Sequence, residues 1–257
     1  SDIIHVEGKV DPIRDIEIIN LELILADLES IGNRIEKIEK KAKAGKDKDD
    51  LVELEALKKA KSALEKNQSL RMVDFTKEEK LAIKSYNFLT LKPIIYMANI
   101  NEEEVSTEDN EYVKKVKEYA ALEKAKVIKV CAKIEEELSQ LDDNDHKEML
   151  LALGIEMSGL DQLIKATYDL LGLATYFTVG TDEVRAWTFK KGMNAKECAG
   201  IIHSDFEKGF IRAEVMSYED LIKCGSELKV KEAGRARLEG KDYIMQDGDI
   251  CHFRFNV

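Results

Sequence analysis

Two stretches of heptad-spaced apolar residues constrain the first third of this chain. In the first stretch, apolar side chains recur at intervals of three and four: Leu21, Ile24, Leu28, Ile31, Ile35 and Ile38. After a break at 40–47 that contains Gly and several Lys, a second stretch follows: Leu51, Leu54, Leu57, Ala60 and Leu64. Such intervals place apolar side chains along one helix face. The sequence predicts an antiparallel helical hairpin that projects as a short stalk; an ordinary helix pair packed on a globular body is the alternative.

Two short apolar runs farther along predict a parallel α/β sheet. Thr76 and Glu79 have the spacing of a capping box and predict a helix start. Runs at 93–99 and 127–132 then flank a helix-like stretch around 112–124. Ligands of parallel sheets bind beyond the carboxyl ends of the strands. We therefore expect the two strand ends, near residues 99 and 131, to share one ligand.

The pattern changes again from about residue 174. Strand-like residues at 176–179 and 184–189 flank a turn and predict a hairpin. Asn194 can cap a following helix, and further strand-like runs occupy 210–215 and 250–255. A hairpin, a helix and more strands within about 85 residues favour a small β-grasp module.

Composition limits the classes of function. Among 257 residues, 44% are hydrophobic and 35% charged, and no apolar run reaches the roughly 20 residues of a membrane helix. Most of the net charge of −11 falls in 87–172, so the other segments can still carry a local basic face. The four cysteines lack the spacing of metal or redox motifs, which predicts reduced thiols and a cytoplasmic protein. The first residues show no initiator Met or signal peptide, so we expect the chain to begin inside a domain.

Four segments, in order, resemble the YchF family of Obg-like P-loop ATPases. They are His-Val-Glu-Gly-Lys-Val-Asp-Pro at 5–12, Met-Ala-Asn-Ile-Asn-Glu at 97–102, Cys-Ala-Lys-Ile-Glu at 131–135, and the run at 203–214. The resemblance covers nearly the whole chain. It implies an α/β fold in which 1–19 and 87–172 are a remnant of the nucleotide-binding (Obg-type G) domain. It further implies an inserted helical coiled-coil domain at 20–86 and a C-terminal β-grasp (ubiquitin-like) TGS domain at 173–257.

The resemblance also implies where a nucleotide base binds. Asn99, Ile100, Asn101 and Glu102 are similar to the family's base-recognition loop, and Cys131 with Ala132 resembles its second base-contacting loop. GTPases have Asn-Lys-x-Asp there, and the Asp accepts from guanine N1–H and the 2-amino group. Adenine lacks that amino group, so a loop without the Asp favours ATP over GTP. Exchanging Ile100 for Lys and Glu102 for Asp is expected to move the preference toward GTP. From the residues alone, a polar turn after a strand is the alternative.

The chain has no Gly-x4-Gly-Lys-Ser/Thr phosphate-binding loop. ATP and Mg²⁺ are therefore expected only in the full-length parent, and this chain alone is predicted to be inactive. The resemblance implies a ribosome-associated, ATP-selective NTP hydrolase that regulates translation or a stress response. A non-enzymatic module that binds RNA, the ribosome or a protein is the alternative.

Several other residues are candidates for binding roles. The candidates for an RNA-facing patch of the C-terminal domain are Lys190, Lys191, Arg212, Lys229, Lys231, Arg235 and Arg237. For Trp187 we expect core packing rather than base stacking, and for His203 a hydrogen bond to backbone at a helix end. The acidic runs at 135–137 and 142–143 are expected to be solvated, and no metal site is expected.

Overall fold

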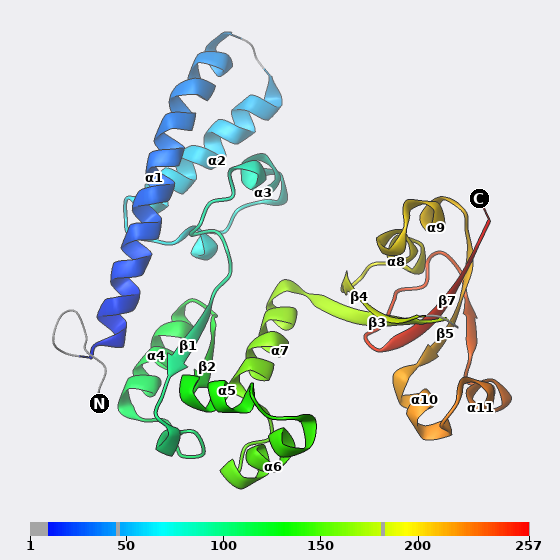
Figure 1. Cartoon of the computed structure of the whole chain (residues 1–257). Helices are drawn as coiled ribbons and strands as arrows, with labels where there is room; N and C mark the ends of the chain where they lie inside the picture. Colours follow the sequence, from blue (N-terminus) through cyan, green and yellow to red (C-terminus); the bar gives the residue numbers. More distant parts are fainter. Residues whose placement is uncertain (1–9, 45–46, 181–182, 257) are drawn as a thin grey trace. The chain divides into compact units, whose positions relative to one another are not determined.

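The computed structural model describes residues 10–44, 47–180 and 183–256 (Figure 1). The chain divides between Leu163 and Ile164 into two compact units. No helix among the described residues is both long and apolar enough to cross a membrane. Each unit is described below by itself.

Two long helices lie side by side at the start of the first unit, as the apolar periodicity predicts (Figure 1). They are α1 (Pro12–Ala44) and α2 (Lys48–Leu64), and Asp47 caps α2 by accepting from the Asp49 amide at 3.1 Å. Their shared core consists mainly of Ile24, Ile31, Ile38, Ala56, Leu57, Ala60, Ala63 and Leu64. The expected seam is wrong at its outer ends, because Leu21 and Leu51 are 46% and 45% exposed. Helix α1 also begins earlier than expected, with Pro12 in the first helical turn.

A buried carboxylate fastens the base of this hairpin. Asp27 on α1 is 3% exposed and accepts three hydrogen bonds. They come from the Leu89 amide at 2.9 Å, the Thr90 amide at 2.8 Å and the Thr90 hydroxyl at 2.6 Å. Between α2 and this point lie η1 (Leu70–Met72), α3 (Lys77–Ile83) and η2 (Lys84–Tyr86). The capping box of Thr76 and Glu79 at the start of α3 is confirmed.

A polar network joins the hairpin to the small sheet that follows. Arg71 donates to Asn20 at 2.9 Å and lies 3.5 Å from the carboxylate of Glu123. The same carboxylate accepts from the Tyr96 hydroxyl at 2.9 Å, and Asn20 donates to the Tyr119 hydroxyl at 3.3 Å. Burial, together with the hydrogen bond to Glu123, raises the pKa of Tyr96. Hydrogen bonds and an ion pair between side chains therefore connect the helical hairpin to the strands and helix of the small sheet.

The sheet of the first unit pairs β1 (Ile95–Asn99) with β2 (Lys126–Val130) in parallel, which confirms the expected strand, helix, strand order. Between them lie η3 (Glu102–Glu104) and α4 (Glu111–Leu122), and after them α5 (Ala132–Leu138) and α6 (Asp143–Leu153). A core forms beside the strand ends from Ile100, Val113, Cys131, Ile134, Leu138 and Leu150. The register puts Asn99 opposite Val130, so both strands end at the same level.

Two acidic positions have structural roles that the sequence reading missed. Glu135, expected to be solvated, accepts from the Gly159 amide at 2.7 Å and the Leu160 amide at 3.1 Å, at the start of α7 (Gly159–Leu171). A carboxylate is favourable there because the first amides of a helix lack intrahelical partners. Asp142 caps α6 by accepting from the Asn144 and Asp145 amides. The expectation of a solvated acid is wrong for Glu135, which is half-buried, whereas Asp142 is exposed as expected and also caps a helix.

The second unit contains a five-stranded sheet with the strand order β4-β3-β7-β5-β6. Its strands are β3 (Leu173–Val179), β4 (Val184–Lys190), β5 (Phe210–Ser217), β6 (Arg237–Glu239) and β7 (Asp249–Phe255). All neighbours are antiparallel except β3 and β7, which are parallel. The expected hairpin and the expected strands near 210 and 250 are confirmed.

Helices cover both faces of this sheet (Figure 1). On one face, α8 (Ala195–Ile202) and α9 (Ser204–Lys208) complete a core around Tyr176, Phe189, Val215 and Cys251. On the other, α10 (Tyr218–Cys224) and α11 (Glu227–Glu232) pack on Met216 and Ile250. The predicted cap at Asn194 is a complete capping box with Glu197. Helices α9 to α11 and strand β6 were not expected, since each is only three to seven residues long.

Candidate nucleotide-base site at the ends of β1 and β2

The ends of the two parallel strands are joined directly. The side-chain oxygen of Asn99 accepts a hydrogen bond from the backbone amide of Ala132 at 3.3 Å. One residue farther, the amide of Ile100 donates to the carbonyl of Val130 at 2.9 Å. Asn99 thereby ties the loop after β1 to the first residue of α5. The structure thus brings together the two loops that the sequence reading assigned to one ligand.

An ion pair closes the outer side of the two loops. Lys133 on α5 lies with its ammonium 2.5 Å from the carboxylate of Glu102, and both side chains are exposed. This partner raises the pKa of Lys133. The pair places a carboxylate and an ammonium at the edge where a ligand of Asn99 would lie.

The loop after β1 is held from behind by Glu104. Its carboxylate accepts from the Asn101 amide at 3.1 Å and from the Asn110 side chain at 2.8 Å, and these two hydrogen bonds hold its pKa below the usual value. Nearby, Asp109 pairs with Lys117 and lies 3.4 Å from the ammonium of Lys129, and the pKa of Asp109 is lowered by Lys117 first and by Lys129 second. The loop therefore has a fixed backbone although it is polar.

Burial separates the six predicted base-contacting residues into two groups. Asn99, Asn101, Glu102 and Ala132 are exposed at the strand ends. Ile100 and Cys131 are only 8% and 5% exposed and belong to the adjacent core. Their side chains hold the loops in place, and a ligand would reach them through their backbone. For the same reason Ile100→Lys would bury an ammonium group, so this substitution is not a clean test of base preference.

The exposed groups fit the base of a nucleotide. Because the oxygen of Asn99 already accepts from Ala132, its amide nitrogen is the group that can donate to N7 of a purine, and the oxygen keeps capacity for a second donor such as a 6-amino group. A cavity behind Cys131 holds about 60 Å³, too little for a base. A base would therefore lie in the open, between the two loops. Among the described residues no cluster of three or more His, Cys, Asp or Glu could hold a metal ion.

Two relatives with full coverage of this chain show its family. The ribosome-binding ATPase YchF of Bacillus subtilis strain 168 is 60% identical over 258 residues, which cover 100% of this chain and 70% of that protein. The protein of the same description from Escherichia coli O157:H7 is 51% identical over 257 residues, with the same coverage. The chain belongs to the YchF family.

A solved structure and a family model point to the same YchF family. The structure of the Schizosaccharomyces pombe YchF GTPase matches with a TM-score of 0.85 at 36% identity, covering 98% of this chain and 68% of that one. The mixed α/β fold is therefore that of a YchF protein. The model of the C-terminal YchF-GTPase family, described as a protein of unknown function, matches residues 173–256. These proteins are named for different nucleotides, ATP for the bacterial relatives and GTP for the yeast protein. The boundaries at 19, 86 and 172 stay predictions.

The seven basic residues predicted to face RNA do not form one surface. Lys190 lies on β4 and Arg237 on β6, at opposite edges of the sheet. Four of the seven have acidic partners: Lys191 with Asp169 at 3.7 Å, Lys231 with Glu214 at 2.5 Å, Arg235 with Asp220 at 2.5 Å and Arg237 with Glu239 at 3.6 Å. Within the described ranges the other three, Lys190, Arg212 and Lys229, are exposed and have no ion pair. Their role toward RNA stays a prediction.

Two further expectations for this YchF-family chain can be checked. Trp187 packs against the core that contains Tyr176 and Phe189, as expected, and donates to the Thr178 hydroxyl at 2.9 Å. His203 accepts from the Asp205 amide at 3.2 Å at the start of α9, also as expected.

Proposed function

We propose that this chain belongs to a cytoplasmic, ribosome-associated P-loop ATPase and supplies its base-recognition loops, its helical insert and its C-terminal TGS domain. The hydrogen bond between Asn99 and Ala132 supports the proposal most, because it assembles the base site from two separate loops. When bound, ATP with Mg²⁺ supplies the phosphoryl group for hydrolysis, and the phosphate-binding loop of the parent holds that end. The residues of this chain position the base.

Selectivity for ATP is proposed to arise from Asn99 and the ion pair beyond it. Guanine needs an acceptor for N1–H and the 2-amino group, which an Asp provides in the Asn-Lys-x-Asp loop. Glu102 is one methylene longer, and its carboxylate is engaged by Lys133 at 2.5 Å. An acceptor neutralised and turned toward α5 does not serve guanine. Adenine, which presents N7 and the 6-amino group, needs only the amide of Asn99.

The test uses the parent protein with its phosphate-binding part present. We expect it to bind ATP more tightly than GTP, and we expect Glu102→Asp combined with Lys133→Ala to shift the ratio of the two Kd values toward GTP by roughly tenfold, the size of one charged hydrogen bond. Lys114→Ala is the control, since Lys114 pairs with Glu111 on α4 away from the loops. A parent that prefers GTP, or a ratio unmoved in the double variant, would contradict the assignment of the base loop.

Ribosome binding is proposed to involve the helical hairpin and the second unit. The observation that supports the second unit is the exposure of Lys190 and Lys229, which have no acidic partner within the described ranges. Phosphate contacts by such lysines make affinity depend on salt. In sedimentation with ribosomes, Lys190→Glu combined with Lys229→Glu should weaken binding of the parent and reduce its salt dependence. Arg235→Ala is the control, because Asp220 already neutralises Arg235. Equal binding by the double variant would remove these lysines from the interface.

A regulatory role in translation or stress is proposed from the same association. It needs the nucleotide to change how the parent engages the ribosome. Ribosome binding measured with ATP and with ADP should differ, and identical affinities would leave a plain binding module as the better description.

A further inference from the structure

The sheet of the second unit opens between two of its strands. Strands β3 and β7 pair only at Phe177 with Ile250 and at Thr178 with Cys251, although β7 continues to Phe255. Beyond Cys251, β7 stays paired with β5 on its other side, and no described strand pairs with the edge that faces β3. Alternate strand residues direct their N–H and C=O groups to the same side. This edge of β7 therefore offers backbone hydrogen-bonding groups to an added chain.

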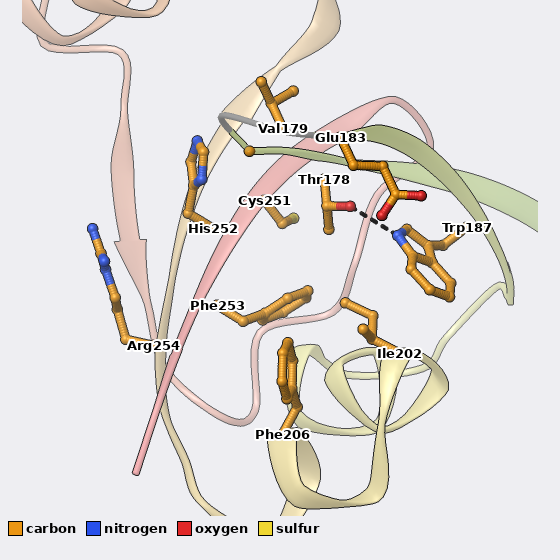
Figure 2. A pocket seen from close by; sticks show the side chains of 11 residues that line it. Thr178, Val179, Glu183, Trp187, Ile202, Phe206, Cys251, His252, Phe253 and Arg254 are labelled. Carbon is orange, nitrogen blue, oxygen red and sulfur yellow. Dashed lines mark hydrogen bonds between the residues drawn. The ribbon is translucent and has the colours of Figure 1, made fainter.

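A groove of about 380 Å³ lies at this opening (Figure 2). One side is apolar and is formed by Trp187, Ile202, Phe206 and Phe253. The indole of Trp187 is held by its hydrogen bond to Thr178, drawn as a dashed line in Figure 2. The ring of Phe206 is held by stacking on Phe255, with centroids 3.8 Å apart. This side is preformed, so little side-chain ordering opposes binding.

The other side of the groove carries positive charge. Arg254 and His252 project from β7 away from Phe253, as the alternation of a strand requires (Figure 2). Arg254 is paired in register with Arg212 on β5, and like charges directly opposite each other in a sheet repel. The acid that pairs with Arg254, Glu214, is 4.0 Å away and already lies 2.5 Å from Lys231.

The other charged residues at the groove do not neutralise the positive charge of Arg254 and Arg212. His252 lies 3.2 Å from Glu227 on α11. Glu183, on the opposite rim, is 3.8 Å from Arg185. Arg254 is 64% exposed, so its guanidinium can turn to an incoming carboxylate.

We propose that this groove binds an extended segment of a partner protein in which apolar and acidic residues alternate, added as a strand along β7. Side chains of a strand point alternately to its two faces. The apolar ones would therefore lie against Phe206 and Phe253, and the acidic ones between them would meet Arg254 and Arg212. At about 3.3 Å per residue, the free edge from 252 to 255 accommodates about four residues.

The same contacts favour a peptide over single-stranded RNA. Bases need an open aromatic face for stacking. The Trp187 ring already carries the guanidinium of Arg185, 4.2 Å from its centroid, and Phe206 is stacked on Phe255. An unpaired strand edge, by contrast, matches the backbone of a peptide.

Trp187 is the single tryptophan of the chain and lies in the groove, so its fluorescence reports binding directly. The full chain is titrated with a blocked hexapeptide that alternates Leu and Glu. We expect a saturable change, weaker binding of a Leu/Lys peptide with the same alternation, and weaker binding of a peptide with the three Leu and three Glu in separate blocks. N-methylation of alternate amides should abolish binding. Equal responses to all peptides, or none, would overturn the proposal.

Charge reversal supplies a test that unfolding cannot imitate. Arg254→Glu should weaken the Leu/Glu peptide by at least about fivefold and strengthen the Leu/Lys peptide. Lys241→Glu is the matched control: Lys241 is also exposed but does not line the groove, and both affinities should stay unchanged. An unaltered preference in Arg254→Glu refutes the site, and binding of hexauridylate without binding of the peptide refutes the proposed class of partner.

Discussion

At the scale of single residues, Tyr86 shows how the hairpin uses one carboxylate twice. Glu53 accepts from the Tyr86 hydroxyl and, at 2.7 Å, from Arg34, whose guanidinium also lies 5.4 Å from the centre of the Tyr86 ring. Burial first, and the hydrogen bond to Glu53 second, raise the pKa of Tyr86 to about 12. Ionising this phenol thus opposes the folded state.

The raised pKa of Tyr86 predicts a loss of stability in alkali. Below its ordinary pKa near 10 the group's contribution is fully present, and it is lost as pH rises toward 12, because the unfolded chain releases the proton first. We expect the free energy of unfolding, measured with urea by circular dichroism, to fall less between pH 8 and pH 11.5 for Tyr86→Phe than for the unsubstituted chain. At pH 8 the variant should be less stable by roughly 1 to 2 kcal/mol, the size of a hydrogen bond to a charged group.

The control for this prediction is Tyr112→Phe, since Tyr112 is exposed on α4 outside the network. Its free energy of unfolding should equal that of the unsubstituted chain at both pH values. If Tyr86→Phe and the parent lose the same stability on going to pH 11.5, ionisation of Tyr86 is not what destabilises the fold.

The residues around the two strand ends show which contacts the sequence predicts and which it does not. Asn99 and Ala132 were assigned to one ligand because parallel strands end together, and the structure joins them. That Ile100 is buried depends on the core built by α4 to α6, which no local pattern reveals. Glu135 caps a helix that starts 24 residues later, so its partners depend on tertiary contact. Capping boxes, strand alternation and the meeting of parallel strand ends were predictable, whereas the tertiary partners of Ile100 and Glu135 were not.

At the scale of elements, the helical hairpin depends on a narrow stripe of α1. Ile24, Ile31 and Ile38 recur every seven residues and are 0% to 3% exposed, whereas Ile18, Ile19 and Leu25 are more than 40% exposed. Apolar identity alone therefore did not reveal which side chains face α2. The heptad spacing did reveal them: Leu28 and Ile35 also pack against this core, and of the predicted seam on α1 only Leu21 is exposed.

A pair of substitutions on α1 tests this stripe. Ile31→Asp places a carboxylate where no polar partner exists in the core, and should destabilise the first unit by roughly 3 kcal/mol or more. Leu21→Asp, the same chemistry on an exposed position of the same helix, should change stability by no more than about 0.5 kcal/mol. Both are read from urea unfolding at 222 nm. Similar losses in the two variants would contradict the assignment of the buried face.

At the scale of the whole molecule, the second unit is expected to fold alone. Its cores lie on both faces of the sheet within residues 164–257. Residues before the predicted boundary at 173 add to it: Tyr168 is hydrogen-bonded to Thr188 at 3.0 Å, and Asp169 lies 3.7 Å from Lys191. The last turns of α7 therefore make direct contacts with the sheet of the second unit.

Fragments 164–257 and 173–257 should both give dispersed amide resonances. The longer one should be more stable by roughly 1 kcal/mol, because it keeps the hydrogen bond of Tyr168. Tyr168→Phe in the longer fragment is the control and should remove most of the difference. Collapsed spectra from both fragments would show that the unit needs the rest of the chain.

The buried carboxylate of Asp27 bears on how freely the length of the helical hairpin can vary. It binds residues 89 and 90, more than sixty positions later, so the two ends of the helical segment are locked to each other at one level of α1. The part of α1 that follows Ile38 lies beyond these hydrogen bonds. Whole turns can therefore be gained or lost at the far end of the hairpin without disturbing its attachment, which leaves the length of the hairpin free to vary.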